Sequence, residues 1–190
     1  MNELLINQNT NIDILNKQDL SKPIQKVKYW ERDYINSKLD IISNKSHKTF
    51  FMFLWRTGCR VSEAIGVRLR DVDFVNYTVT IRWLKKRKYE TRIIPLHPEL
   101  RNILDYYVTN LKHDDRLFNF SRQRADQISR KYFNGSCHKF RHSFAVNWLR
   151  SGGDLYLLSR MLGHSSVKVT ETYLQIVPID IGKELIKVQF

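Results

Sequence analysis

The chain has 190 residues, of which 32 are lysine or arginine and 19 are aspartate or glutamate, so its formal net charge at pH 7 is +13. Such a charge favours a polyanion, above all nucleic acid, as the partner. Hydrophobic residues make up 42% of the chain, which is too many for a disordered basic tail, and the length suits one domain better than two full-size ones.

Membrane and secreted proteins are disfavoured by the same sequence. The longest apolar run is far shorter than the roughly 20 residues of a membrane span, and the first residues do not resemble a secretion signal. Cys59 and Cys137 are the only cysteines and form no CxxC motif. This excludes a disulfide scaffold and a cysteine-ligated zinc site, and it suits a reducing compartment. We expect a cytoplasmic, nucleoid-associated protein with no membrane partner.

The first half of the chain begins with a polar, Asn-rich tail over residues 1–20. A helical stripe of apolar residues follows from Pro23 to Ile42, and a polar break covers residues 44–47. Residues 48–57 are apolar nearly all round and end at Gly58, which predicts a central buried helix with a glycine C-cap. Ser62 is predicted to cap a short helix over residues 63–69.

The second half begins with two β-rich runs, residues 77–84 and 91–96, joined by the basic stretch 85–90. These runs predict a β-hairpin with a positively charged tip. Further helices are predicted at 98–111, at 122–132 capped by Ser121, at 137–151 after Ser136, at 155–162 between Asp154 and Gly163, and at 167–175 after Ser166. The predicted fold class is mainly α with a small antiparallel β-hairpin, that is, α+β.

Basic residues are concentrated in three stretches that could line one face and neutralise DNA phosphates. The stretches are Arg56 to Arg70, Arg82 to Arg92, and Arg122 to Arg141. A single basic stretch could equally be an ordinary solvated surface. The residues predicted to bind DNA are Arg56, Lys85, Arg87, Lys88, Arg122, Arg124 and Lys139.

The pattern His-x-x-Arg occurs twice. His113 and Arg116 lie beside two aspartates in a predicted loop, and we interpret them as ordinary surface. His138 and Arg141 open a helix at i, i+3 spacing, so they share one face near an N-terminus that favours anions. Guanidinium groups can hold the oxygens of a phosphodiester as negative charge develops on them.

Three more residues could join that pair, although each alone is more often an ordinary surface or core residue. Arg60 lies between the helix end at Gly58 and the next helix, and Glu63 offers a partner to fix it. His164 and Tyr173 are nine residues apart and would face opposite sides of one continuous helix. They can converge only if the chain breaks between them, and Gly163 with the following serines predicts such a break.

The segments TGCRVSE, HKFRH and LGHSSVKVTETY resemble, in order and spacing, the three active-site boxes of the tyrosine recombinases, the phage-integrase group. The resemblance runs from about Pro23 to Val177 and implies that family's catalytic-domain fold. It identifies the catalytic residues as Arg60, Lys86, His138, Arg141, His164 and Tyr173. The lysine comes from the similarity of KRKYETRIIPL to the family's hairpin, in which Lys85 and Lys88 remain alternatives to Lys86.

The resemblance implies that Tyr173 attacks a phosphate of double-stranded DNA and becomes linked to the 3′ end, while a 5′-hydroxyl departs. Arg60 and Arg141 would stabilise the phosphorane, Lys86 would protonate the leaving oxygen, His138 would take the tyrosine proton and His164 would hydrogen-bond the phosphate. No metal or other cofactor is needed. The implied assembly is a dimer or tetramer on DNA.

The predicted domains are a flexible tail (1–20), a catalytic domain (21–177) and a helical segment (178–190) that packs on its own domain or on a neighbouring protomer. Most family members carry an additional amino-terminal DNA-binding domain, for which the tail is too short. We therefore expect either a piece of a longer protein or a small single-domain member. Two alternative functions remain: an inactive or accessory DNA-binding module, and a type IB topoisomerase.

Overall fold

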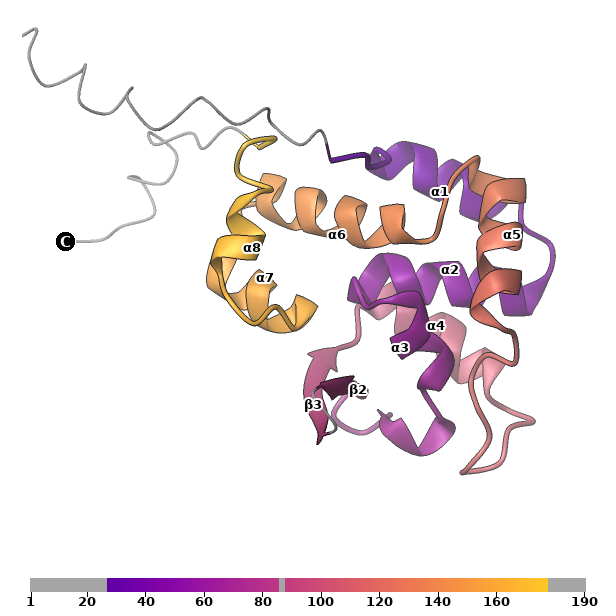
Figure 1. Cartoon of the computed structure of the whole chain (residues 1–190). Coiled ribbons are helices and arrows are strands. Elements are labelled where there is room, and N and C mark those ends of the chain that lie inside the picture. The colour runs from indigo at the N-terminus through magenta and orange to yellow at the C-terminus, as the bar shows by residue number, and fades with distance from the viewer. Residues whose placement is uncertain (1–26, 86–87, 178–190) are drawn as a thin grey trace, which may run out of the picture.

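The computed structural model describes residues 27–85 and 88–177, with the elements arranged as in Figure 1. In chain order the elements are α1 (Arg32–Asp40), α2 (Lys45–Thr57), α3 (Val61–Gly66), η1 (Leu69–Asp71), β1 (Val72–Asp73), β2 (Thr78–Lys85), β3 (Lys88–Pro95), α4 (Pro98–Tyr107), α5 (Arg122–Phe133), α6 (His138–Arg150), α7 (Leu155–Leu162) and α8 (Lys168–Glu171). The expected fold class, mainly helical with a small antiparallel sheet, is confirmed.

Helix α2 is the centre of the domain, because it is apolar on nearly every side and packs against both α6 and α4. Figure 1 shows it running beside α6 through the middle of the molecule. The Asn44 side chain accepts a hydrogen bond from the His47 amide, and Gly58 ends the helix at φ 63°, a conformation that favours glycine. The break expected over residues 44–47 is therefore wrong beyond Asn44, whose cap lets the helix begin at Lys45.

Aromatic rings fill the space around α2. Phe51 packs against Phe133 and Phe140, with ring centroids 4.9 and 5.3 Å apart, and Phe50 contacts Phe118 at 5.1 Å. All five side chains are essentially buried. Removal of one such ring from a core costs about 3–5 kcal/mol. This core holds the ends of α2 and α6, which carry residues of the predicted site, at a fixed separation.

Two predicted helix starts are wrong for local reasons. Residues 27–31 are not helical, because the Trp30 amide donates to Ser143 Oγ and its ring packs against Phe140, so α1 begins only at Arg32. Helix α3 begins at Val61 and not after Ser62, because Arg60 is the N-cap and the Glu63 carboxylate accepts from its amide.

Other predicted boundaries shift as well. The Cys137 amide donates to Asp126 Oδ1 of α5, so Ser136 is not the cap of α6. Helix α4 ends at Tyr107, earlier than expected, and α8 is a single turn that ends before Tyr173. The predicted caps Ser121 and Asp154 are confirmed, since each side chain accepts from an amide in the first turn of its helix.

The three strands form one antiparallel sheet in the order β1-β2-β3. Strands β2 and β3 pair from Thr78↔Pro95 to Lys85↔Lys88, so most of the stretch predicted as a turn, 85–90, is paired strand. Residues 86–87, which connect the two strands, lie outside the described residues. The short strand β1 was not predicted.

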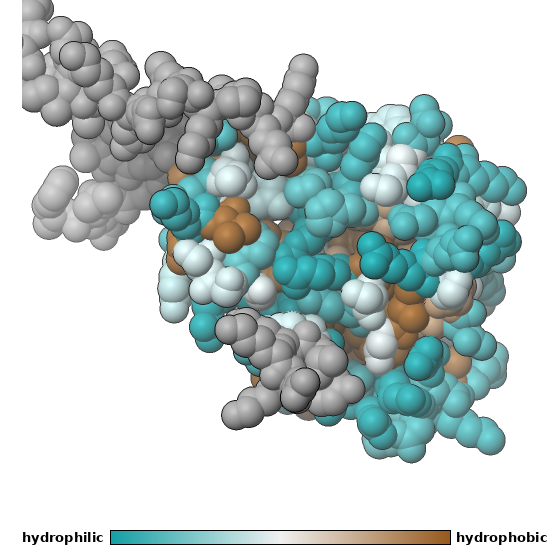
Figure 2. Space-filling view, in the orientation of Figure 1, coloured by the Kyte–Doolittle hydropathy of each residue, from teal (hydrophilic) through white to brown (hydrophobic). Residues whose placement is uncertain are grey.

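A second apolar cluster lies between α6, α7 and the end of the described chain. Its buried members include Val146, Leu158, Leu162 and Tyr173. Hydrophilic residues cover most of the surface seen in Figure 2, as expected for a protein whose large apolar side chains are in its core. Among the described helices, none has the length and apolar character to cross a bilayer.

Candidate active site

Arg141 is the buried centre of the site. Its side chain is on the first turn of α6 and only 3% of the residue is exposed. Nη1 donates to the Gly58 carbonyl at the end of α2 (3.0 Å), and Nη2 donates to the Leu162 carbonyl at the end of α7 (2.7 Å). Carbonyls at helix C-termini lack helical partners and carry partial negative charge, which stabilises the cation. The guanidinium thus holds two helix ends and retains N–H donors for a ligand.

Burial and a neighbouring arginine disfavour the charged form of Arg141. Burial lowers the pKa of Arg141 to about 10, and the positive charge of Arg60 acts in the same direction, while Glu63 and Tyr173 act against it. The side chain therefore remains charged at neutral pH. An anion that binds beside two neighbouring cations, one of them desolvated, lowers their electrostatic free energy. A phosphodiester is such an anion.

Arg60 is fixed by Glu63, as the sequence suggested. Its Nη1 donates to Glu63 Oε1 at 2.9 Å, while the rest of the side chain is partly exposed. Glu63 is buried and also accepts two hydrogen bonds from Arg92 of β3, at 2.7 and 3.3 Å. Burial acts to raise the pKa of the Glu63 carboxyl, but the hydrogen bonds from Arg92 and Arg60 outweigh it, so that pKa lies below its usual value.

Tyr173 lies directly after α8 and is buried in the second apolar cluster. Its hydroxyl makes a hydrogen bond of 2.9 Å with Nδ1 of His142. Burial raises the pKa of Tyr173, although the positive charges of Arg141 and Arg60 act to lower it. The phenol is therefore protonated at neutral pH, and any reaction at its oxygen requires a group that accepts the proton.

His164 lies in the turn between α7 and α8, as the predicted chain break required. Gly163 ends α7 at φ 66°, and His164 Nδ1 makes a 2.8 Å hydrogen bond with Thr170 Oγ1. Burial, together with the positive charges of Arg141 and Arg60, lowers the pKa of His164 to about 4. The imidazole is neutral at pH 7 and lies within the electrostatic reach of both arginines.

His138 occupies the exposed first position of α6. Desolvation lowers its pKa, and so do the charges of Arg141, Arg60 and Arg122. Its ring meets that of His142 edge to face, with centroids 4.3 Å apart. Five of the six predicted catalytic residues are thus gathered around one cluster of positive charge: Arg60, His138, Arg141, His164 and Tyr173.

The catalytic role of a hairpin lysine stays a prediction. Lys86 and Arg87 lie outside the described residues, and the structure describes only the backbone of Lys85 and Lys88, which pair across the end of the sheet. The helical segment expected over residues 178–190 and the tail expected over residues 1–20 also lie outside the described residues.

The predicted DNA-binding residues lie at different distances from the cluster. Arg122 is exposed at the start of α5 and lowers the pKa of His138, and Arg124 is exposed two residues further along. Lys139 lies over the Trp30 ring, with Nζ 5.0 Å from its centroid. Arg56 is in another environment, where it pairs with Glu99. The contact of each residue with DNA stays a prediction.

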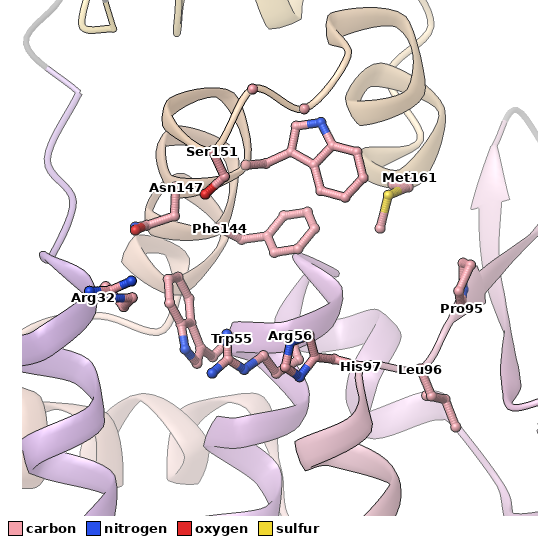
Figure 3. A pocket seen from close by; sticks show the side chains of 13 residues that line it. Arg32, Trp55, Arg56, Pro95, Leu96, His97, Phe144, Asn147, Ser151 and Met161 are labelled. Atoms are coloured by element: carbon pink, nitrogen blue, oxygen red, sulfur yellow. The ribbon is translucent and has the colours of Figure 1, made fainter.

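Arg56 lines a cavity of about 580 Å³ between the end of α2, the start of α4 and the second half of α6. Figure 3 shows Phe144 and Asn147 of α6 on one side and Trp55 and Arg56 of α2 on the other. The lining of this cavity includes none of the five residues gathered around Arg141.

Two residues of the cluster were not predicted from the sequence. His142 follows Arg141 directly and is four residues after His138, so the helical period puts it on the same face, a signal that HKFRH already contained. Arg92 joins the cluster through Glu63 and through the Met161 carbonyl, to which Nε donates at 2.6 Å. No local pattern predicts that contact, because it joins residues 69 positions apart. Among the described residues, no group of histidine, cysteine, aspartate and glutamate is arranged to hold a metal ion.

The chain is similar to known proteins in sequence and in fold. The family model described as "Phage integrase family" matches residues 31–178. The tyrosine recombinase XerA of Saccharolobus solfataricus is 27% identical over 168 residues, which cover 86% of this chain and 57% of that relative. The chain thus spans little more than half the length of this relative.

Two solved structures have a similar fold. The catalytic domain of bacteriophage HP1 integrase matches with a TM-score of 0.68 at 23% identity, over 85% of this chain and 95% of that one. The XerH site-specific recombinase, solved bound to its difH substrate, matches with a TM-score of 0.64 at 19% identity, over 84% of this chain and 52% of that one. With the family model matching most of its length, the chain belongs to the phage integrase family, the tyrosine recombinases.

Proposed function

We propose that this protein cleaves and rejoins DNA strands as a site-specific tyrosine recombinase, through a 3′-phosphotyrosine intermediate. One observation carries the proposal: the buried Tyr173 hydroxyl lies within the electrostatic reach of both Arg141 and Arg60. A phenol beside two guanidinium groups suits attack on a phosphodiester, because the cations stabilise the negative charge of the transition state.

The roles follow from chemistry and from the family. Arg60 and Arg141 hold the non-bridging oxygens of the scissile phosphate, and His164 donates a hydrogen bond to the same group. A hairpin lysine, Lys86 in our assignment, protonates the leaving 5′-oxygen, and a histidine of the first turn of α6 takes the tyrosine proton, for which the family resemblance indicates His138. The phosphotyrosyl ester conserves the free energy of the broken bond, so a 5′-hydroxyl can reverse the step without a nucleotide cofactor.

The partner in this proposal is double-stranded DNA, and the active assembly is a dimer or tetramer on that DNA. The net charge of +13 supports a polyanion, and the related XerH recombinase is described in complex with its difH substrate. We expect the protein to act in the cytoplasm, at the nucleoid. Residues 21–177 would form the catalytic domain.

Covalent trapping tests the proposal. The protein is incubated in EDTA with a pool of duplexes that carry a randomised sequence around a nick, so that cleavage releases a short strand and cannot be reversed. Complexes that survive SDS are isolated and sequenced. The wild-type protein is expected to form adducts, whereas Tyr173→Phe forms none. Tyr156→Phe, at an exposed tyrosine of α7, is the matched control and is expected to behave as wild type.

The alternative functions give different results in the same experiment. A non-catalytic DNA-binding module would bind duplexes in a salt-dependent manner and form no adduct with any sequence. A type IB topoisomerase would form the adduct and relax supercoils without recombinant products. Adduct formation by Tyr173→Phe at the wild-type level would contradict the proposed nucleophile.

A further inference from the structure

The second histidine of HKFRH is the group in contact with the Tyr173 oxygen. His142 Nδ1 lies 2.9 Å from Tyr173 Oη, and the two ring centroids are 5.7 Å apart. Within the described part of the chain, this is the only hydrogen bond that the Tyr173 hydroxyl makes. Because Tyr173 is buried, the proton it loses on attack must pass to a group already at this position.

Both partners of this hydrogen bond are neutral at pH 7. Burial, together with the nearby His138 and Arg141, lowers the pKa of His142 to about 4, so its ring is neutral at pH 7. His164, whose pKa is also lowered by His142, is neutral as well. A neutral imidazole has one nitrogen without a proton. In the tautomer that carries its proton on Nε2, Nδ1 accepts from the protonated phenol, and this is the arrangement that proton transfer from Tyr173 requires.

His138 is less well located for the same task. Its ring contacts His142 and not Tyr173, it is exposed at the helix start, and no hydrogen bond joins it to the phenol among the described residues. Its edge-to-face contact with His142 makes it a neighbour of the proton acceptor.

We propose that His142, and not His138, is the general base of strand cleavage in this chain, an inference that depends on the proposed function. As the bond from Tyr173 Oη to phosphorus forms, the phenolic proton moves to His142 Nδ1. The bond from phosphorus to the 5′-oxygen then breaks, and the hairpin lysine supplies the proton for that oxygen. The resulting imidazolium is stabilised by the charge that the phosphorane gains. On rejoining, the same proton returns to Tyr173.

The first experiment measures single-turnover adduct formation on a nicked duplex recovered from the pool, at several pH values. His142→Asn keeps a hydrogen-bonding atom near the position of Nδ1 but cannot accept a proton. We expect the rate constant of His142→Asn at pH 7 to be at least about 100-fold lower than that of the wild type, as for loss of a general base. We also expect that rate to rise about tenfold per pH unit as the phenol ionises on its own, while the wild-type rate depends weakly on pH.

The comparison variant is His138→Asn. If His142→Asn retains the wild-type rate, or if the loss and the steep pH dependence appear only in His138→Asn, the proposal is wrong. Because Asn preserves the hydrogen bond, a merely structural role for His142 would be rescued by that substitution, whereas proton transfer would not.

A second substrate separates the base from the acid. A 5′-phosphorothiolate at the scissile position has a thiolate leaving group, which needs no proton. This substrate is expected to restore cleavage to Lys86→Ala and to leave His142→Asn slow. Restored cleavage in His142→Asn would mean that His142 acts on the leaving group and would overturn the proposal.

A readout that needs no DNA separates this inference from the proposed function. In the protein labelled with ¹⁵N at histidine, we expect Tyr173→Phe to shift the Nδ1 resonance of His142 and to leave that of the exposed His113 unchanged. An unshifted His142 resonance would show that His142 and Tyr173 are not in contact, and it would overturn the proposal even if adducts form. If wild-type protein forms no adduct with any duplex, the proposed function fails whatever the resonance shows.

Discussion

The chain contains the pattern His-x-x-Arg twice, and the two copies have opposite environments. His113 and Arg116 are exposed in the loop before α5, where His113 lies 4.0 Å from Asp114. His138 and Arg141 begin α6, and Arg141 is 3% exposed with two backbone carbonyls as partners. The residue types are equal in both copies. The two copies differ because the folded chain places two backbone carbonyls, those of Gly58 and Leu162, against Arg141.

The two copies also differ in the carboxylates that surround them. The loop copy has acidic neighbours on its own segment, Asp114 and Asp115. The α6 copy is stabilised by dipoles, while the carboxylate of Glu63 is occupied by Arg60 and Arg92. Such a cluster keeps its positive charge available for a phosphate, because no carboxylate of residues 27–85 or 88–177 pairs directly with Arg141.

The largest expected effect comes from removing the arginine of each copy in turn. Arg141→Ala leaves two carbonyls without their donor, and hydrogen bonds to charged groups contribute about 1.5–3 kcal/mol each. We expect the free energy of unfolding to fall by about 3 kcal/mol or more, with loss of adduct formation. Arg116→Ala is the control and is expected to change stability by less than about 0.5 kcal/mol. Urea denaturation checks both values, and equal losses would remove the distinction between the two copies.

The next effect concerns two arginines on the hairpin. Arg92→Gln removes a partner of the buried Glu63 and of the Met161 carbonyl, so we expect a loss of about 3 kcal/mol, as for a broken buried ion pair. Arg82→Gln removes a half-exposed partner of Asp71 and is expected to cost about 1 kcal/mol or less. Thermal unfolding measures both variants, and the opposite order would show that Arg92 is not the structural link between hairpin and site.

A further expected effect is a dependence of stability on pH. His142 and His164 have pKa values of about 4 in the folded protein against an unfolded value of 6.5, so the unfolded chain binds more protons between these values. Their contribution is complete above pH 6.5 and is lost as the pH falls toward 4. Removal of both imidazoles should flatten the unfolding temperature over this window, whereas His113→Gln, at an exposed histidine, should leave the slope unchanged. A slope unaffected by the double variant would contradict the neutral state of both rings.

Local patterns predicted most of the helices and the chain break that lets His164 and Tyr173 converge, because caps and glycine conformations depend on neighbouring residues. They failed at Trp30 and at Cys137, where partners more than ten residues away decide where the helix begins. The same limit applies to the site. Arg60 and Arg141 were predicted from their boxes, but Arg92 reaches Glu63 only through the folded hairpin. His142 could have been predicted from helical period alone.

The central proposal is that Tyr173 attacks the phosphate, and one measurement tests it most directly. The adduct trapped on a nicked duplex is digested with protease and nuclease, and the peptide that carries the remaining nucleotide is sequenced by mass spectrometry. We predict that the nucleotide is attached through its 3′-phosphate to the phenolic oxygen of Tyr173. Attachment to any other residue, with Tyr173 unmodified, would contradict it.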